Sequence, residues 1–194
     1  MLEICINNFL FKNLSFKSNN NRICITGVNG SGKTTLLRCI LGLEKYDGKI
    51  DIDREKIDIS KCSFLFSGDN LGFEELTLKE NLEYYLKLLE IDLDKDLYSK
   101  LIVEFNIHKY ENYLFKNVSE GTKQKLRLVI ILLQKNELII LDEPTNYLDS
   151  ISIDNFINYI NMHNEYKFII SSNDKILLEK INGDFLILGE NKND

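Results

Sequence analysis

The residues best suited to chemistry form a short glycine-rich loop near the N-terminus. In order, they are Gly27, Val28, Asn29, Gly30, Ser31, Gly32, Lys33, Thr34 and Thr35. This order fits the pattern G-x-x-x-x-G-K-[ST], in which glycines let the backbone turn sharply and aim several N–H groups at an anion. The charge of Lys33 can reach the β- and γ-phosphates of a nucleotide, and the hydroxyl of Thr34 can bind Mg²⁺. The loop therefore predicts a site for a nucleotide and its magnesium ion.

A second candidate site consists of two adjacent carboxylates, Asp142 and Glu143, which follow the apolar run 138–141. The run predicts a buried strand, and open α/β sheets bind ligands at the carboxyl ends of their strands. Asp142 can hold the Mg²⁺ there, directly or through water. Glu143 points differently and is placed to activate a water in line with the γ-phosphate, a general-base role worth about 10²–10⁴-fold in rate.

The flanking segments are those that such a loop requires. Residues 22–26 are typical of a short buried strand, and residues 35–43 are typical of an apolar helix whose N-terminus adds positive charge to the site. Further apolar runs at 62–66, 138–141, 167–171 and 185–188 predict strands, and helical patterns lie between them. We therefore predict an α/β fold with a phosphate-loop NTPase core and a mostly parallel sheet.

Two other features modify this core. Residues 2–6 and 9–16 alternate with period two and predict an antiparallel pair at an edge, and residues 48–53 predict a half-exposed strand. From about residue 77 to residue 117 the spacing of apolar residues is helical, which predicts an inserted group of two or three helices.

Composition restricts the classes of partner. The 194 residues fit one domain, and the net charge of −6 argues against a nucleic-acid partner. No stretch of 18 apolar residues predicts a membrane span, and the N-terminus shows no secretory signal. The scattered cysteines predict buried, reduced thiols in a cytosolic compartment. They are Cys5, Cys24, Cys39 and Cys62.

Three further motifs make a family resemblance specific. Residues 76–82 are Leu-Thr-Leu-Lys-Glu-Asn-Leu, residues 118–124 are Val-Ser-Glu-Gly-Thr-Lys-Gln, and residues 141–149 are Leu-Asp-Glu-Pro-Thr-Asn-Tyr-Leu-Asp. Together with the phosphate loop and in this order, they resemble the nucleotide-binding domain of ATP-binding cassette (ABC) proteins over nearly the whole chain. The middle motif matches the position of the family's signature sequence, which opens a helix.

The resemblance implies an ATP site shared by two subunits. By position, Ser119 and Gly121 would contact the γ-phosphate held by a second ABC ATPase subunit, and Asp149 would help to couple the two sites. It also implies ATP and Mg²⁺ as ligands, a head-to-tail homo- or heterodimer, and a peripheral location on the cytoplasmic face of a membrane. An integral membrane permease would dock on a helical subdomain at 76–117, next to a core of residues 1–75 and 118–194.

The chain departs from the family pattern at three places. Gly68 stands where a glutamine is expected, and the neighbouring Asp69 is either a substitute Mg²⁺ ligand or part of a plain turn. Asn173 replaces a histidine, and it can hydrogen-bond a γ-phosphate oxygen but cannot take up a proton. The family pattern places an adenine-stacking aromatic residue near the position of Cys5, and no aromatic residue stands at that position. Phe9 is the nearest candidate, with a core role as the alternative. We therefore expect strong ATP binding and slow hydrolysis by the isolated chain.

Several functions remain open from the sequence. The leading one is the ATP-hydrolysing subunit of an exporter. Residues 10–16 and the glutamine-free loop resemble the haem-exporter subunit of cytochrome c maturation, whereas residues 121–124 and 145–146 resemble exporters of the ABC-2 type. The alternatives are a soluble ABC regulator, such as a translation factor, and a degenerate cassette that binds ATP only as a switch.

Overall fold

A parallel sheet of five strands forms the centre of the computed structural model, which describes residues 1–7, 11, 13–53, 57–69 and 71–189. Its strand order is β5-β6-β7-β3-β8, and every neighbouring pair is parallel. The five strands are β3 (Arg22–Gly27), β5 (Cys62–Leu65), β6 (Leu138–Asp142), β7 (Lys167–Ser171) and β8 (Asp184–Leu188). All residues of β6 and β7 are buried, as expected for central strands covered on both faces.

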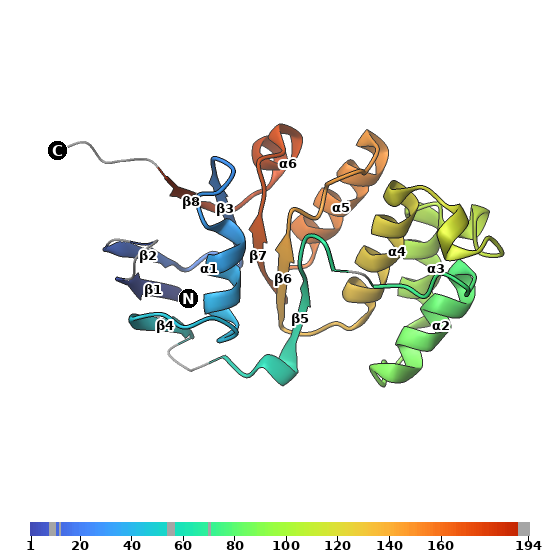
Figure 1. The fold of residues 1–194 in the computed structure, drawn as a ribbon, viewed down its shortest axis with the longest axis horizontal. Coiled ribbons are helices and arrows are strands. Elements are labelled where there is room, and N and C mark those ends of the chain that lie inside the picture. The colour runs from blue at the N-terminus through green and yellow to red at the C-terminus, as the bar shows by residue number, and fades with distance from the viewer. Residues whose placement is uncertain (8–10, 12, 54–56, 70, 190–194) are drawn as a thin grey trace.

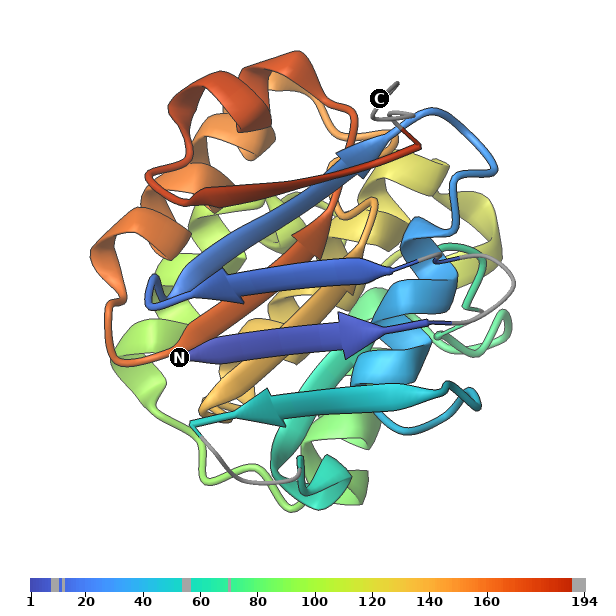
Figure 2. The ribbon, with the colours of Figure 1, turned by 90° about the vertical axis from the view of Figure 1, so that its left-hand side faces the viewer.

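A smaller antiparallel sheet lies at one end of the molecule, on the left in Figure 1 and facing the viewer in Figure 2. Its order is β2-β1-β4. The strands are β1 (Leu2–Ile6), β2 (Leu14–Ser18) and β4 (Gly48–Ile52). Helix α1 (Lys33–Ile40) packs between this sheet and the central one, because Leu36, Leu37 and Ile40 share a single hydrophobic cluster with residues of both sheets.

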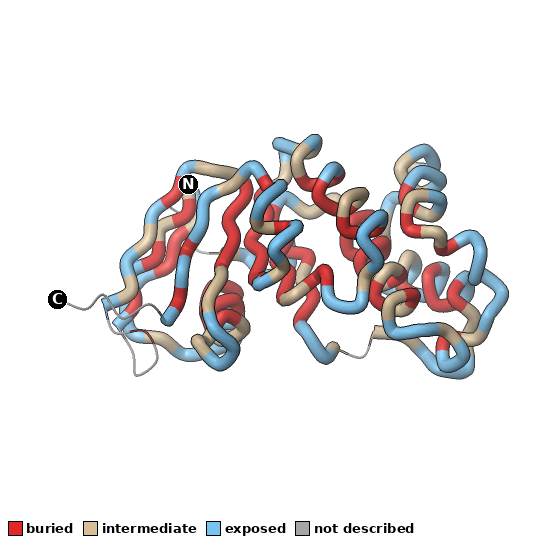
Figure 3. The backbone as a smooth tube through the Cα atoms, turned by 90° about the horizontal axis from the view of Figure 1, so that it is seen from above, coloured by how far each residue is buried: buried red, intermediate tan, exposed pale blue. Residues whose placement is uncertain are grey.

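The remaining helices cover the other face of the central sheet and extend away from it. They are α2 (Leu78–Leu88), α3 (Lys95–Glu104), α4 (Glu120–Leu133), α5 (Ser150–Met162) and α6 (Lys175–Lys180). Helix α4 lies between the sheet and the pair α2 and α3, which form the opposite end of the molecule (Figure 1). Buried segments run through the strands and along α4 (Figure 3), so one continuous core joins the sheet to these helices.

Side-chain caps set where these helices begin. Thr77 and Glu80 form a capping box at α2, and Asp94 caps α3. Ser119, Asp149 and Asp174 accept backbone hydrogen bonds at the first turns of α4, α5 and α6. As a result α4 begins at Glu120, directly after its cap Ser119.

The predicted α/β fold with a mostly parallel sheet and an antiparallel β edge is confirmed. The expectation of four buried thiols is wrong for Cys5, which is exposed. Cys5 lies on the outward side of β1, where buried and less buried residues alternate. The other three cysteines are buried, and burial raises the pKa of the Cys24 thiol to about 12.

Candidate functional site

The glycine-rich loop connects the end of β3 to the start of α1, and its backbone explains its glycines. Gly27 and Gly32 have φ angles of 148° and 94°, in the region that favours glycine. A Cβ at Gly27 would lie 2.3 Å from the carbonyl oxygen of Leu188, and one at Gly32 would lie 3.0 Å from the ring of Phe11. The loop therefore has its shape because β8 and Phe11 pack closely against it.

Lys33 is held inside the loop by two oxygen atoms. Its ammonium group donates to the carbonyl oxygen of Gly27 at 3.0 Å and lies 3.4 Å from Oε1 of Glu143. Glu143 has a φ of 49°, and its N–H points back to β7, 2.9 Å from the carbonyl oxygen of Ser171. This turn directs the carboxylate of Glu143 toward the lysine. The ammonium group of Lys33 is thus paired with two oxygen atoms, which an anion bound in the loop could replace.

Asp142 joins the loop to the end of β6. Its carboxylate is 2% exposed and accepts a hydrogen bond from Thr34 Oγ1 at 2.8 Å. The Ser67 N–H approaches the same oxygen at 3.3 Å, and the hydroxyl of Ser171 donates to the other one. Two residues 108 positions apart in the sequence therefore meet at the carboxyl edge of the sheet.

These groups line one cavity of about 410 Å³. Its lining residues are Asn29, Gly30, Gly32, Lys33, Thr34, Thr35, Ser67, Asp142 and Glu143. A hydroxyl and a carboxylate are hard oxygen ligands of the kind that Mg²⁺ prefers. The described residues contain no cluster of three or more histidine, cysteine or acidic side chains fit to hold a metal. Thr34 and Asp142 are the residues of this cavity that could hold Mg²⁺.

The predicted signature residues lie elsewhere in the chain. Ser119 caps α4 by accepting from the Thr122 N–H at 3.2 Å, and Gly121 lies so close to the next loop that a Cβ would be 2.4 Å from the carbonyl oxygen of Tyr147. They line a second cavity, of about 290 Å³, and among the described residues the two cavities share no lining residue. Within one chain, Ser119 and Gly121 are therefore separate from the phosphate loop.

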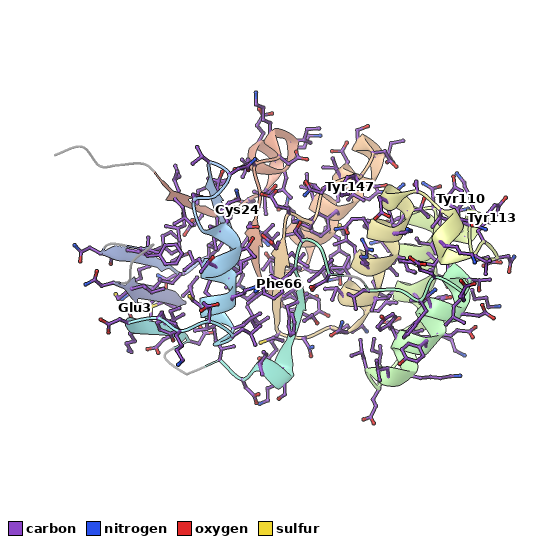
Figure 4. The ribbon with its side chains drawn as sticks, in the orientation of Figure 1. Glu3, Cys24, Phe66, Tyr110, Tyr113 and Tyr147 are labelled. Atoms are coloured by element: carbon purple, nitrogen blue, oxygen red, sulfur yellow. The ribbon has the colours of Figure 1, made fainter. Side chains whose placement is uncertain are left out.

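Asp149 belongs to this second cavity and ties α5 to α4. It accepts from the Ser152 N–H at 2.8 Å and pairs with the ammonium group of Lys125. Burial raises the pKa of Asp149, but the hydrogen bonds from Lys125 and Ser152 outweigh burial and lower it to about 2. Tyr110, another residue of this cavity, lies at the end of the molecule formed by α2 and α3 (Figure 4).

Asn173 contacts the back of the phosphate loop. Its Oδ1 accepts from Thr26 Oγ1 at 3.1 Å and from the Gly27 N–H at 3.2 Å, and its Nδ2 donates to Asn29 Oδ1 at 3.4 Å. It does not line the cavity of Lys33 and Glu143. A role for Asn173 at the γ-phosphate stays a prediction.

The loop after β5 adopts a turn of its own. Gly68 has a φ of 89°, and the carboxylate of Asp69 accepts from the Phe66 N–H at 3.0 Å. Of the two alternatives for Asp69, this hydrogen bond favours the plain turn. Ser67, in the described part of this loop, reaches Asp142 through its backbone N–H. Phe9, the candidate for stacking on adenine, lies outside the described residues.

Sequence reasoning missed the part of Ser171 in this site. Ser171 pairs with Asp142 in the register of β6 and β7, so its hydroxyl lies beside the carboxylate. The sequence places Ser171 at the end of a strand, at the same edge of the sheet as Asp142, but it does not show that β6 and β7 are neighbours. It also missed Gln124, whose buried amide donates to the carbonyl oxygen of Pro144 at 3.1 Å and so connects α4 to the segment after Glu143.

Comparisons with known proteins agree with this geometry. A family model described as "ABC transporter" matches residues 11–146. The chain is 35% identical over 147 residues to the cytochrome c biogenesis ATP-binding export protein CcmA of Vibrio cholerae, covering 72% of this chain and 71% of that protein. It is 30% identical over 172 residues to the protein of that name from Wolbachia pipientis, covering 84% and 81%.

A solved structure of an ATP-binding subunit of an ABC transporter is similar in fold, with a TM-score of 0.76, 23% identity and coverage of 96% of this chain and 85% of that one. In the part of the chain that the structure describes, no helix is long and apolar enough to cross a membrane. The match to the family model, from residue 11 to residue 146, spans 136 of the 194 residues. It includes both the phosphate loop and the Asp142–Glu143 pair. This chain belongs to the ABC transporter family, as an ATP-binding domain.

Proposed function

We propose that this chain binds ATP with Mg²⁺ and hydrolyses it to drive export through separate membrane subunits. One observation carries the proposal: the hydroxyl of Thr34 meets the buried carboxylate of Asp142 at 2.8 Å, in the cavity that also contains Lys33 and Glu143. A phosphate cradle, a pair of Mg²⁺ ligands and a potential base thus occupy one place, as phosphoryl transfer to water requires.

Each residue has a distinct task in this proposal. The loop Gly27–Thr35 supplies backbone N–H groups to the phosphates, and Lys33 leaves its carbonyl and carboxylate partners to pair with the β- and γ-phosphates. Thr34 and Asp142 hold the metal, which when bound offsets negative charge on the phosphates. Glu143, freed from Lys33, accepts a proton from the attacking water.

Hydrolysis by the isolated chain is slow in this proposal. Gly68 brings no side chain to the water or to Mg²⁺, and its φ of 89° belongs to a glycine conformation. Asn173 cannot accept a proton from the reacting groups as a histidine can. Binding is preserved because the loop and Asp142 are intact. Glu143 is present as the base, but neither Gly68 nor Asn173 supplies the side chain that would orient the attacking water.

A second ATPase subunit completes the site. Ser119, Gly121 and Asp149 line a cavity separate from the phosphate loop of their own chain, which supports their use by a partner's nucleotide. We propose a head-to-tail dimer with two ATP molecules between the subunits. In a heterodimer, the site completed by this chain's Ser119 and Gly121 could turn over faster than its own.

The names of relatives support a transport function that involves a membrane partner. Two relatives carry names that specify export in cytochrome c biogenesis, which supports an export function for this chain as well. We propose that residues 76–117 form a helical subdomain that receives an integral permease, and that residues 1–75 and 118–194 form the core. The chain would then lie on the cytoplasmic face of the membrane.

One observation favours a second candidate, an ABC cassette that binds ATP as a switch with negligible turnover. Asn173 does not line the cavity of Glu143, and its amide oxygen accepts hydrogen bonds from Thr26 and Gly27 instead. Single-turnover hydrolysis separates the two candidates, because a switch retains its bound ATP whereas the proposed subunit cleaves it slowly.

Co-purification tests the transport function. The tagged full chain, expressed in its source cells, is isolated from solubilised membranes with and without ATP, and integral proteins that co-purify in fixed ratio are identified. We expect a polytopic permease with the wild type, and its loss when exposed contacts on α2 are altered. Recovery of the chain only from the soluble fraction, with no integral partner, would contradict the proposal.

A further inference from the structure

The carboxamide of Asn173 hydrogen-bonds three groups in the phosphate loop and in the residue just before it. The amide oxygen accepts two hydrogen bonds, from Thr26 Oγ1 and the Gly27 N–H, and the amide nitrogen donates to Asn29. A carboxamide suits this arrangement because its oxygen has two lone pairs and its nitrogen has two protons. Asn173 lies two residues beyond the end of β7, so the contacts connect the first part of the loop to the segment that follows the neighbouring strand.

We propose that Asn173 is a positioning residue that holds the phosphate loop in its nucleotide-binding shape, whether the nucleotide carries two phosphates or three. The inference rests on the proposed function, since it assumes that the loop binds nucleotide. Its physical basis is entropy. Glycine-rich segments lose the most conformational freedom when they are ordered, and contacts that order them beforehand reduce the entropic cost of binding.

The position of Asn173 relative to the cavities distinguishes this role from contact with the γ-phosphate. It lines a cavity of about 430 Å³ with Gly27, Val28 and Leu188, on the side of β8. Lys33 and Glu143 line a different cavity, and among the described residues the two share no lining residue. To reach a γ-phosphate there, Asn173 would have to release the loop. A γ-phosphate contact therefore matters only for ATP, whereas the positioning role matters equally for ADP.

Substitutions at Asn173 remove the three contacts in steps. Asn173→Ala removes all of them. Asn173→His leaves one acceptor nitrogen with a single lone pair, which can serve either Thr26 or Gly27 but not both. All three contacts are exposed to solvent, so water can replace them without a large change in the stability of the fold.

A matched control is available in α5. Asn161 donates to the carbonyl oxygen of Lys180 at 3.0 Å and accepts from the Asn182 N–H at 3.1 Å. Its carboxamide thus also connects two segments of the chain, but it lines none of the cavities of the phosphate loop. Asn161→Ala therefore removes a comparable set of contacts at a place without nucleotide.

The test is the affinity of the purified full chain for Mg²⁺–ADP and for a Mg²⁺–ATP analogue with a non-hydrolysable β,γ bridge, measured by titration calorimetry. We expect Asn173→Ala to weaken both affinities by a similar factor of about five to ten, and Asn173→His to weaken both by less. We expect Asn161→Ala to bind both like the wild type. The melting temperatures of the Asn173 variants should remain within about 2 °C of the wild type.

Several results would overturn the inference alone, with the wild type binding both nucleotides. In one, Asn173→Ala leaves the affinity for ADP unchanged and weakens the affinity for the ATP analogue, which would indicate a γ-phosphate contact. In another, Asn173→Ala changes the affinity for neither nucleotide. A loss of affinity in both Asn173 variants that accompanies a melting temperature more than about 5 °C lower would also overturn it, because loss of folded protein would explain the result. A wild type that binds neither nucleotide would overturn the proposed function, and the inference with it.

Discussion

A single methyl group at Gly121 tests the packing between α4 and the loop before α5. A Cβ there would lie 2.4 Å from the carbonyl oxygen of Tyr147, against 3.4–4 Å for an ordinary contact. Gly121→Ala must therefore move one backbone away from the other. Overpacking of this kind costs about 1–3 kcal/mol, and alanine in place of helical glycine returns about 0.5–1 kcal/mol. We expect a net loss of about 1–2 kcal/mol in the free energy of unfolding.

Thermal unfolding followed by circular dichroism measures this loss. For a chain of this size, each kcal/mol shifts the melting temperature by about 2–4 °C, so we expect a decrease of about 2–8 °C. Tyr147 provides the matched variant, because its φ of 66° is unfavourable for a residue with a side chain. Tyr147→Gly should raise the melting temperature by itself and should restore much of the loss in the double variant. A Gly121→Ala chain that melts higher than the wild type would refute the argument.

Three other predictions use groups at different places in the fold. Asn81 is fully buried and hydrogen-bonds to Phe73 and to two carbonyl groups of the segment before α2. Asn81→Ala should therefore lower the free energy of unfolding, measured in urea, by about 2–4 kcal/mol. A loss below about 1 kcal/mol would be inconsistent with these contacts. Because the pKa of Asp149 is lowered from 3.8 to about 2, its contribution to stability is complete above pH 3.8 and is lost as the pH falls toward 2. Asp149→Asn should remove about 1 kcal/mol of this pH-dependent stability, a value reduced because Asp149 is exposed. The melting temperature measured against pH checks this, and an unchanged slope between about pH 2 and pH 4 would contradict the contacts with Lys125 and Ser152. Thr34→Ser should keep the Mg²⁺ dependence of ATP binding and Thr34→Val should lose it, as measured by titration with and without EDTA; equal behaviour of the two would exclude a role for the hydroxyl.

Local sequence patterns were sufficient to predict most of the fold. Residues 167–171 are uniformly apolar apart from their ends, and the predicted strand matches β7 residue for residue. Helix starts were less accurate. Helix α1 begins at Lys33, two residues before the predicted Thr35, because Gly32 caps it in a left-handed conformation. Boundaries of this kind depend on backbone geometry, which apolar spacing does not report.

The candidate site was predictable to the extent that its residues belong to motifs. Thr34 and Asp142 were expected to meet at one metal, and they do contact each other directly. The direction of Asn173 and the contact of Ser171 with Asp142 could not be derived, because each depends on how separate segments pack side by side. Spacing along the chain identifies which residues are at the end of a strand, but not which neighbour each one faces.

The measurement that tests the central claim most directly compares ATP binding with ATP turnover in the wild type and in Glu143→Gln. We predict that the wild-type chain binds Mg²⁺–ATP and turns over more slowly than about 1 s⁻¹, at or below the low end for enzymes. Glu143→Gln should bind ATP more tightly, because Lys33 loses the carboxylate that lies 3.4 Å away in the free chain, and it should show no phosphate release above background. Rapid turnover by the isolated wild type, or phosphate release by Glu143→Gln at the wild-type rate, would contradict the account.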